Sequence, residues 1–164
     1  MIFRNDDVSF KTEAGQFKEV HNLFKKYIIL HTVALICKGI ERNKELINFI
    51  NHNDIDVQIH CWEHYRFNEN KNILAADLKK SVKNVTKYFN NPPTVVYPPW
   101  NEADDEVMKI CADMGLQCNP VKVSLQQFIR FGGNPGCDVV NFHSWAYDDI
   151  ISLEPALKIY SQNR

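Results

Sequence analysis

Two pairs of residues have the types and spacing of metal ligands. Asp6 and Asp7 are adjacent carboxylates that directly follow a short apolar run, and His60 and His64 are imidazoles four positions apart. If residues 60–64 form a helical turn, the two histidine Cβ atoms lie about 5–6 Å apart, and both rings can reach one cation at about 2.0–2.1 Å. Adjacent side chains of a strand point to opposite faces, so Asp6 and Asp7 share a site only if the backbone bends. The alternatives are a solvated Asp-Asp turn and two structural histidines.

Two further segments carry groups suited to an active site. Tyr97-Pro98-Pro99-Trp100 is a rigid aromatic loop that can wall a pocket and present a backbone N–H to a substrate. His143 directly follows an apolar run and has the position of a catalytic acid or base. A strand-to-helix connector with a buried tryptophan, and a hydrogen-bonded structural histidine, are the alternatives.

The elements that must position these residues alternate in type along the chain. Apolar runs typical of strands occupy residues 2–4, 27–36, 55–60, 94–97, 116–119 and 139–143. Helical patterns lie between them, near residues 13–26, 41–52, 70–90, 102–114 and 153–162. This alternation predicts an α/β fold with a parallel sheet, either open and doubly wound or closed into a barrel. In both cases the carboxyl ends of the strands gather at one face, and all four segments follow such ends.

Length and composition restrict the classes of function. The 164 residues suit a single domain covering residues 1–164. A net charge of -1 argues against nucleic acid as a partner, and no apolar run is long enough to span a membrane. The five cysteines are odd in number and contain no C-x-x-C pair, which favours reduced thiols. With charged residues from position 4 in place of a secretory signal, we expect a cytoplasmic protein.

The ordered set of segments resembles the polysaccharide deacetylases, the metal-dependent NodB-like carbohydrate esterases. Their first motif, Thr-Phe-Asp-Asp-Gly, is matched here by Arg-Asn-Asp-Asp-Val at residues 4–8. Their second motif, His-Ser/Thr-x-x-His, is matched by His-Cys-Trp-Glu-His at residues 60–64. Their Arg-x-Pro-aromatic-Gly motif is matched by Tyr-Pro-Pro-Trp-Asn at residues 97–101, and their final strand ending in histidine by residues 140–143.

The resemblance implies a fold, a metal and residue roles. The fold would be a distorted (β/α) barrel of about seven strands, incomplete in a chain this short. One divalent ion, most simply Zn²⁺ but also Co²⁺, Ni²⁺ or Fe²⁺, would bind to Asp7, His60 and His64. Asp6 would be the general base and His143 the general acid. Tyr97, Pro99 and Trp100 would form the substrate-binding loop.

Two departures from the family pattern affect the catalytic groups. Tyr97 stands where the family has an arginine beside the base aspartate. Arg4 is our first substitute, because it shares a strand face with Asp6, and Arg130 is a second. The family's aspartate partner of the catalytic histidine has no convincing match, with Asp138 and Asp148 as weak candidates.

The expected function is metal-dependent hydrolysis of an N-acyl group, acetyl or formyl, on a sugar or a sugar-containing intermediate. A non-catalytic carbohydrate-binding relative is the alternative, because the family's third-motif arginine is missing and its fourth motif is degenerate. A third hypothesis is a non-haem iron oxygenase, which also uses two histidines and one carboxylate. Alternating strands and helices disfavour it. The oligomeric state is not predicted.

Overall fold

Seven strands form one sheet in the computed structural model, which describes residues 1–134 and 136–163. All pairings among the described strands are parallel, and their order is β5-β4-β3-β2-β1-β7-β6. The strands are β1 (Ile2–Val8), β2 (His31–Ile36), β3 (Asp56–Cys61), β4 (Val95–Val96), β5 (Gln117–Cys118), β6 (Val123–Ser124) and β7 (Val139–Phe142).

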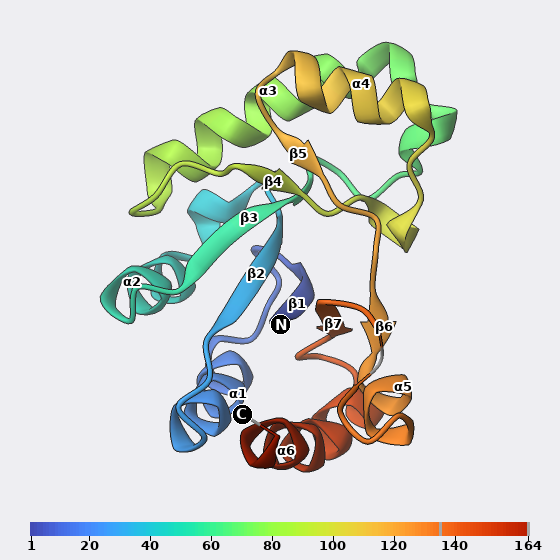
Figure 1. Cartoon of the computed structure of the whole chain (residues 1–164). Helices are drawn as coiled ribbons and strands as arrows, with labels where there is room; N and C mark the ends of the chain where they lie inside the picture. Colours follow the sequence, from blue (N-terminus) through green and yellow to red (C-terminus); the bar gives the residue numbers. More distant parts are fainter. Residues whose placement is uncertain (135, 164) are drawn as a thin grey trace.

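The sheet curls into a half-barrel, with helices around its outside (Figure 1). The longest strands are the central ones, and the two edge strands, β5 and β6, have two residues each. The architecture is an incomplete (β/α) barrel, so the predicted fold class is confirmed. A curled sheet brings the carboxyl ends of its strands around one opening, where loops from distant parts of the chain can meet.

The described residues also form six α-helices and three short 3₁₀ helices, which lie between strands except for the last α-helix, which follows β7. They are α1 (Ala14–Lys26), η1 (Ile40–Arg42), α2 (Lys44–His52), η2 (Phe67–Glu69), α3 (Lys71–Tyr88), η3 (Pro99–Asn101), α4 (Asp105–Asp113), α5 (Leu125–Arg130) and α6 (Tyr147–Gln162). None of the described helices has the length and apolarity needed to cross a membrane.

The apolar core lies between the sheet and these helices, in two clusters. One joins α2, α3 and α4 to the sheet from β2 to β5, and includes Leu46, Leu78 and Val107. The other joins α5 and α6 to β1 and β7, and includes Phe3 and Phe128. Full burial of a leucine or phenylalanine contributes about 1.5–3 kcal/mol. These clusters therefore hold the strands that carry the polar residues.

Polar side chains occupy the face of β1 that points into the barrel, away from the helices. Phe3 packs against the outer helices, so Arg4 and Asp6, two residues apart, point to the inside of the barrel. Both are buried, and Arg4 is among the largest fully buried side chains. A buried charge needs a partner, and Arg4 and Asp6 are partners of each other.

The boundaries of two predicted elements differ from those observed. Residues 27–30 were expected in the second strand, but Tyr27 caps α1 and Ile28 turns the chain with a left-handed φ of 57°. The strand therefore begins at His31. The last helix begins at Tyr147 rather than at 153 and contains Pro155.

β6 and α5 were not predicted. A signal was present, because Ser124 and Gln127 form a capping box at the start of α5. Each element is so short that it offers little periodicity.

Candidate active site

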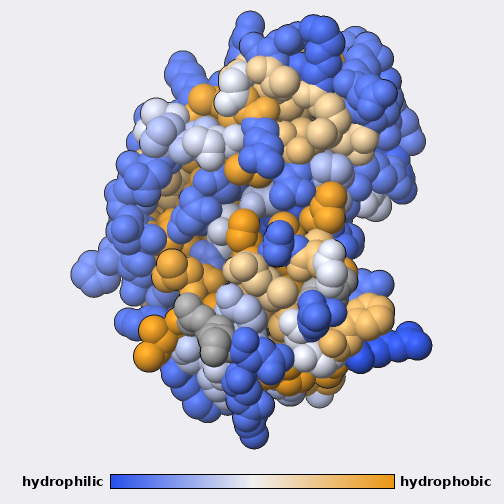
Figure 2. Space-filling model, viewed as in Figure 1, coloured by the Kyte–Doolittle hydropathy of each residue, from blue (hydrophilic) through white to orange (hydrophobic). Residues whose placement is uncertain are grey.

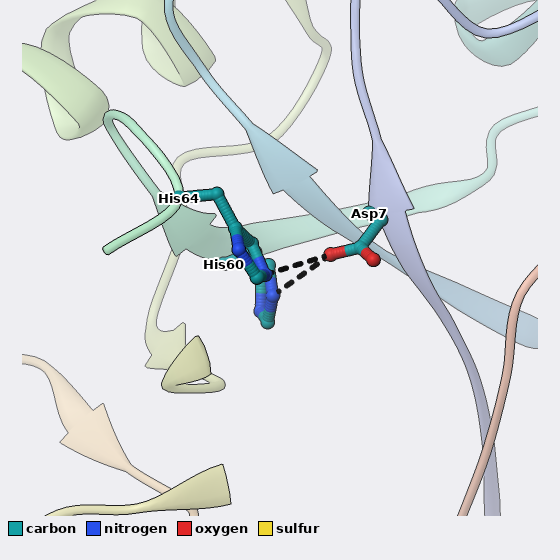
Figure 3. A group of neighbouring side chains, drawn as sticks. All are labelled: Asp7, His60 and His64. Carbon is teal, nitrogen blue, oxygen red and sulfur yellow. Dashed lines mark ion pairs between the residues drawn. The ribbon is translucent and has the colours of Figure 1, made fainter. Parts of the chain in front are cut away.

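Asp7, His60 and His64 meet at the carboxyl ends of β1 and β3. The Nε2 atoms of His60 and His64 each lie 3.1 Å from Oδ1 of Asp7 (Figure 3). Possible ligand atoms of the three residues all lie within 4.8 Å of one another. Two ligands of a tetrahedral Zn²⁺, each about 2.0–2.1 Å from the ion, are about 3.3 Å apart. Each histidine nitrogen therefore lies from the aspartate oxygen at about the separation that one such ion requires.

The hydrogen bond between His60 and the Tyr97 carbonyl determines which nitrogen of the His60 ring carries the hydrogen and which carries a lone pair. Nδ1 of His60 lies 2.6 Å from the carbonyl oxygen of Tyr97. A carbonyl oxygen only accepts, so Nδ1 donates the hydrogen, and Nε2 of the neutral ring carries a lone pair. That lone pair points at a carboxylate oxygen that is buried and accepts no hydrogen bond from the described residues. Two electron-rich atoms facing each other fit a cation between them.

The electrostatics of Asp7 agree with this donor set. Burial works to raise the pKa of Asp7, but the hydrogen bonds and positive charges that His60 and His64 supply when protonated, in the place of a cation, hold that pKa well below its ordinary value. The carboxylate is therefore ionised at neutral pH. One carboxylate and two imidazoles leave further coordination positions of a divalent ion open. The residues present fit such an ion.

A backbone irregularity in β1 lets the adjacent side chains of Asp6 and Asp7 point to different parts of the site. The pairing of β1 with β2 shifts register between Asn5 and Val8, and Asp7 has a left-handed φ of 61°. Bulges of this kind redirect side chains, and they are frequent beside active sites. Asp6 keeps the inward direction of Arg4, while Asp7 reaches the histidines at the rim.

Arg4 binds Asp6 through two parallel hydrogen bonds. Nε of Arg4 donates to Oδ1 at 2.6 Å, and Nη2 donates to Oδ2 at 2.7 Å. Asn141 on β7 lies 3.4 Å from the same Oδ2. A bidentate arginine holds a carboxylate in one orientation. Asp6 is thus held in a fixed orientation inside the barrel.

The loop after β4 is tied to this pair. Nη2 of Arg4 also donates to Oδ1 of Asn101 at 2.6 Å, and its guanidinium lies 4.5 Å from the centre of the Tyr97 ring. Trp100 and Asn101 have left-handed φ values of 56° and 59°. This tight turn places the Trp100 ring 4.5 Å from that of His64. Arg4 therefore connects the aspartate inside the barrel to the loop that borders the histidines.

His143 follows β7 and is oriented by Asp149. Oδ2 of Asp149 lies 2.9 Å from Nδ1 of His143 and accepts its backbone N–H at 2.8 Å. The other ring nitrogen, Nε2, lies 3.8 Å from Oδ2 of Asp7. Burial works to lower the pKa of His143, but the hydrogen bond to Asp149 and the charges of Asp6, Asp7 and Asp149 raise it above its ordinary value.

Two exposed tryptophans border the site on different loops. Trp100 is 45% exposed and contacts His64, and Trp145 is 60% exposed with its ring 5.1 Å from that of His143. Tyr97 and Pro99 are buried. Of the three residues predicted to bind substrate, only Trp100 offers a surface to a ligand. The other two support Arg4, His60 and the loop.

The predicted metal ligands lie together, but the backbone between His60 and His64 does not have the expected conformation. His60 is the penultimate residue of β3, and His64 lies in an irregular loop, so no helical turn joins them. Arg4 lies against Asp6 as expected from the strand face, and Arg130 lies at the end of α5.

Sequence reasoning missed Asp149 and Trp145. Neither Asp138 nor Asp148 pairs with His143, because one turn of chain after β7 returns Asp149 to the histidine. The spacing of six residues between His143 and Asp149 matches no regular period, so only the path of the loop reveals it. Trp145 carried a weak signal, as an aromatic residue two positions after a strand-end histidine.

A known protein family matches the segments that carry the candidate site. The sequence model of the polysaccharide deacetylase family matches residues 6–119, well over half of the chain. The matched range includes Asp6, Asp7, His60, His64 and the loop after β4. No curated protein matches the sequence.

Solved structures of low sequence identity share the fold. A pseudoenzyme of carbohydrate esterase family 4 from Bacillus anthracis superposes with a TM-score of 0.81 at 15% identity, over 99% of this chain and 61% of its own. Peptidoglycan deacetylase PdaC from Bacillus subtilis gives a TM-score of 0.78 at 14% identity, over 99% and 84%. A family 4 carbohydrate esterase from Streptomyces lividans gives 0.79 at 13%, over 98% and 87%. The chain thus spans less than two thirds of the first of these.

Proposed function

The chain belongs to the polysaccharide deacetylase family, and from this premise we propose that it is a metal-dependent hydrolase that removes an N-acetyl or N-formyl group from a sugar or a sugar-containing intermediate. The observation that carries the proposal is the convergence of four groups from β1, β3 and β7. Asp7, His60 and His64 face one point, and Nε2 of His143 lies 3.8 Å from Asp7.

Asp7, His60 and His64 would hold the divalent ion. Zn²⁺ suits this ligand set best, and Co²⁺, Ni²⁺ or Fe²⁺ can use the same donors. When bound, the ion would supply Lewis acidity that polarises an acyl oxygen and lowers the pKa of a water molecule. The Tyr97 carbonyl keeps the Nε2 lone pair of His60 directed at the ion's position.

Asp6 would act as the general base and take a proton from the attacking water. Arg4 orients the Asp6 carboxylate with two hydrogen bonds. This is the arginine that the family places in its third motif, supplied here from two residues before the aspartate. A backbone N–H in the segment Pro99–Trp100 would stabilise the oxyanion. Proline has no backbone N–H, so the donor would be that of Trp100.

His143 would protonate the leaving amine. Asp149 accepts from Nδ1 of His143, so a second proton would be carried on Nε2, on the side of Asp7. The carboxylates around the ring raise its pKa and so favour the charged form that an acid must have. Asp149 would thereby serve as the aspartate partner of His143 for which the sequence offered no convincing match.

Trp100 and Trp145 would contact the sugar. Apolar faces of sugar rings pack on aromatic rings, and both tryptophans are exposed beside groups of the site.

All five cysteines are free. Free thiols in this number support a reducing compartment, so we propose a cytoplasmic substrate.

The second candidate is a carbohydrate-binding protein without catalysis. It is favoured by the replacement of the third-motif arginine by Tyr97. Arg4 and Asp149 weaken this candidate, because they provide the two contacts that the motif changes remove. An oxygenase is disfavoured by the α/β fold.

Release of acetate or formate tests the proposal directly. The protein, freed of metal and reloaded with Zn²⁺, is incubated with a panel of N-acetylated and N-formylated mono- and oligosaccharides. We expect metal-dependent release of the acid. Asp7→Ala should lose bound metal, whereas Asp6→Asn and His143→Ala should keep it and lose turnover by about 10²- to 10⁴-fold.

The variants also distinguish the two candidates. Saccharide binding without release of acid, unchanged in Asp6→Asn, would identify a binding protein. Full activity in Asp6→Asn or His143→Ala would show that the assigned role is wrong. Metal bound with no release across the panel would count against the hydrolase.

A further inference from the structure

A hollow of about 870 Å³ lies at the end of the barrel opposite the candidate active site. It is bordered by the start of β1, the turn between α1 and β2, and the turn between α2 and β3. These are the amino ends of parallel strands, so the hollow faces away from the carboxyl ends that carry Asp7 and His60. Its lining includes Met1, Ile2, Ile28, Leu30, Lys25 and Asp54.

Large apolar side chains around this hollow are open to solvent. Leu30 is 92% exposed and Ile28 is 85% exposed, and Met1 and Ile2 are also exposed. Figure 1 marks the N-terminus near the middle of the view, and Figure 2 shows apolar side chains, interspersed with polar ones, in the central part of the same view. Single exposed apolar residues are ordinary, but four around one hollow are typical of an interaction surface.

The backbone of Ile28 strengthens this interpretation. Ile28 follows the end of α1 with a left-handed φ of 57°, a conformation that strains a β-branched residue. The end of α4 uses Gly115, at a φ of 73°, in the equivalent place. Ile28 thus has both a strained backbone and an exposed apolar side chain. Burial against another molecule would offset that cost.

The charges around the hollow indicate which molecule would cover it. Lys25 lies on one side, at the end of α1, and Asp54 lies on another, at the end of α2. Among residues 1–134 and 136–163, neither forms an ion pair. In a two-fold symmetric contact the same surface is present on both partners. Lys25 of one copy can then face Asp54 of the other, on both sides of the axis.

We propose that this face joins two copies of the chain in a symmetric dimer. The exposed Leu30 of each copy enters the hollow of the other, Ile28 packs at its edge, and Lys25 pairs with Asp54 across the interface. The two candidate active sites then face away from the contact and stay open. The proposal does not depend on the proposed function, because its test measures mass and not turnover.

Sedimentation equilibrium of the 164-residue chain over a range of concentrations tests the dimer. We expect a mass of twice 19.1 kDa, and 19.1 kDa for Leu30→Glu. Because Leu30 is exposed, the unfolding temperature of the monomeric Leu30→Glu variant should lie close to that of the wild type at its most dilute. Val121→Glu is the matched control, an exposed aliphatic residue away from the hollow, and it should remain dimeric.

Two further variants test the role of charge and backbone. Lys25→Glu should weaken the dimer at least tenfold, and Lys25→Glu combined with Asp54→Lys should restore it. Ile28→Gly should relieve backbone strain, so that the chain stays folded, yet weaken association. A wild type that is monomeric at every concentration overturns the proposal, and so does a Leu30→Glu variant that remains dimeric.

Discussion

Two side chains of the candidate site, Arg4 and Asp149, lie at positions in the chain that differ from the family's motifs, and each acts on a neighbour; Arg4 was expected from the sequence and Asp149 was not. Arg4 holds Asp6 with a bidentate contact although the family places its arginine in the loop after the fourth strand. Asp149 holds both the backbone and the ring of His143. What matters for a carboxylate or an imidazole is the contact and its geometry. The contact can therefore be kept while its position in the sequence changes.

A prediction at the scale of the residue concerns Asp149. Asp149→Asn keeps the size of the side chain but removes the charged acceptor that sets the tautomer and orientation of His143. Turnover should fall by about 10²- to 10⁴-fold, with KM and metal content little changed. Steady-state kinetics and elemental analysis measure these quantities.

The adjacent Asp148 gives the control, because it is exposed and forms no contact with His143 among the described residues. Asp148→Asn should behave as the wild type. Equal losses in the two variants would mean that Asp149 has no special role.

At the scale of the element, β1 shows how one strand supplies two functions. Its alternation sends Arg4 and Asp6 inward, and its bulge then sends Asp7 to the rim. A regular strand would place Asp7 on the outer face, against the helices. The irregularity of β1 is therefore a requirement of the site.

The packing of α1 on β2 leads to a prediction about pH. His31 on β2 lies 3.0 Å, between ring nitrogens, from His21 on α1, surrounded by aromatic rings. Burial, with the charge of His21, lowers the pKa of His31 to about 3. The unfolded chain has an ordinary histidine pKa near 6.5, so it binds more protons than the folded chain between pH 6.5 and 3. Stability therefore falls as the pH falls through this range.

The loss should approach about 1.4 kcal/mol per pH unit for this one histidine. Chemical denaturation between pH 6.5 and 5, above the range of most carboxylates, measures it. His31→Gln should reduce the slope of stability against pH. His52→Gln, at an exposed histidine, should leave the slope unchanged. Identical slopes for wild type and His31→Gln would contradict the assignment.

At the scale of the whole molecule, the proposed metal would connect β1 to the loop after β3. An ion that binds the folded chain and not the unfolded one adds about 2.7 kcal/mol at 100 times its dissociation constant. For a domain of this size we expect a rise of about 5–10 °C in the unfolding temperature with Zn²⁺. Differential scanning calorimetry with and without Zn²⁺ measures the rise.

Asp7→Ala should abolish that rise, and Asp6→Asn should retain it, because Asp6 pairs with Arg4 and is not a proposed ligand. A similar rise in Asp7→Ala would place the ion elsewhere. No rise in the wild type would remove the basis for the metal site.

The sequence by itself determined the class of fold and most of the candidate groups. Strand and helix periods are local properties, and the rule that carboxyl ends of parallel strands meet allowed Asp7, His60 and His143 to be assigned to one face. The resemblance to a family then supplied expected roles. Short or irregular elements were not predicted, as with β6, α5 and the turn at Ile28, since a segment of two to six residues carries little periodicity.

Only the tertiary structure decided how these groups are connected. The loop after β7 brings Asp149 to His143, and the turn at Trp100–Asn101 joins Asn101 to Arg4. The hollow beside Leu30 exists because the start of β1 and two turns, one before β2 and one before β3, come together at one place. Such contacts depend on the path of the whole chain, because the distance between two side chains on different loops is set by packing and not by their separation in sequence.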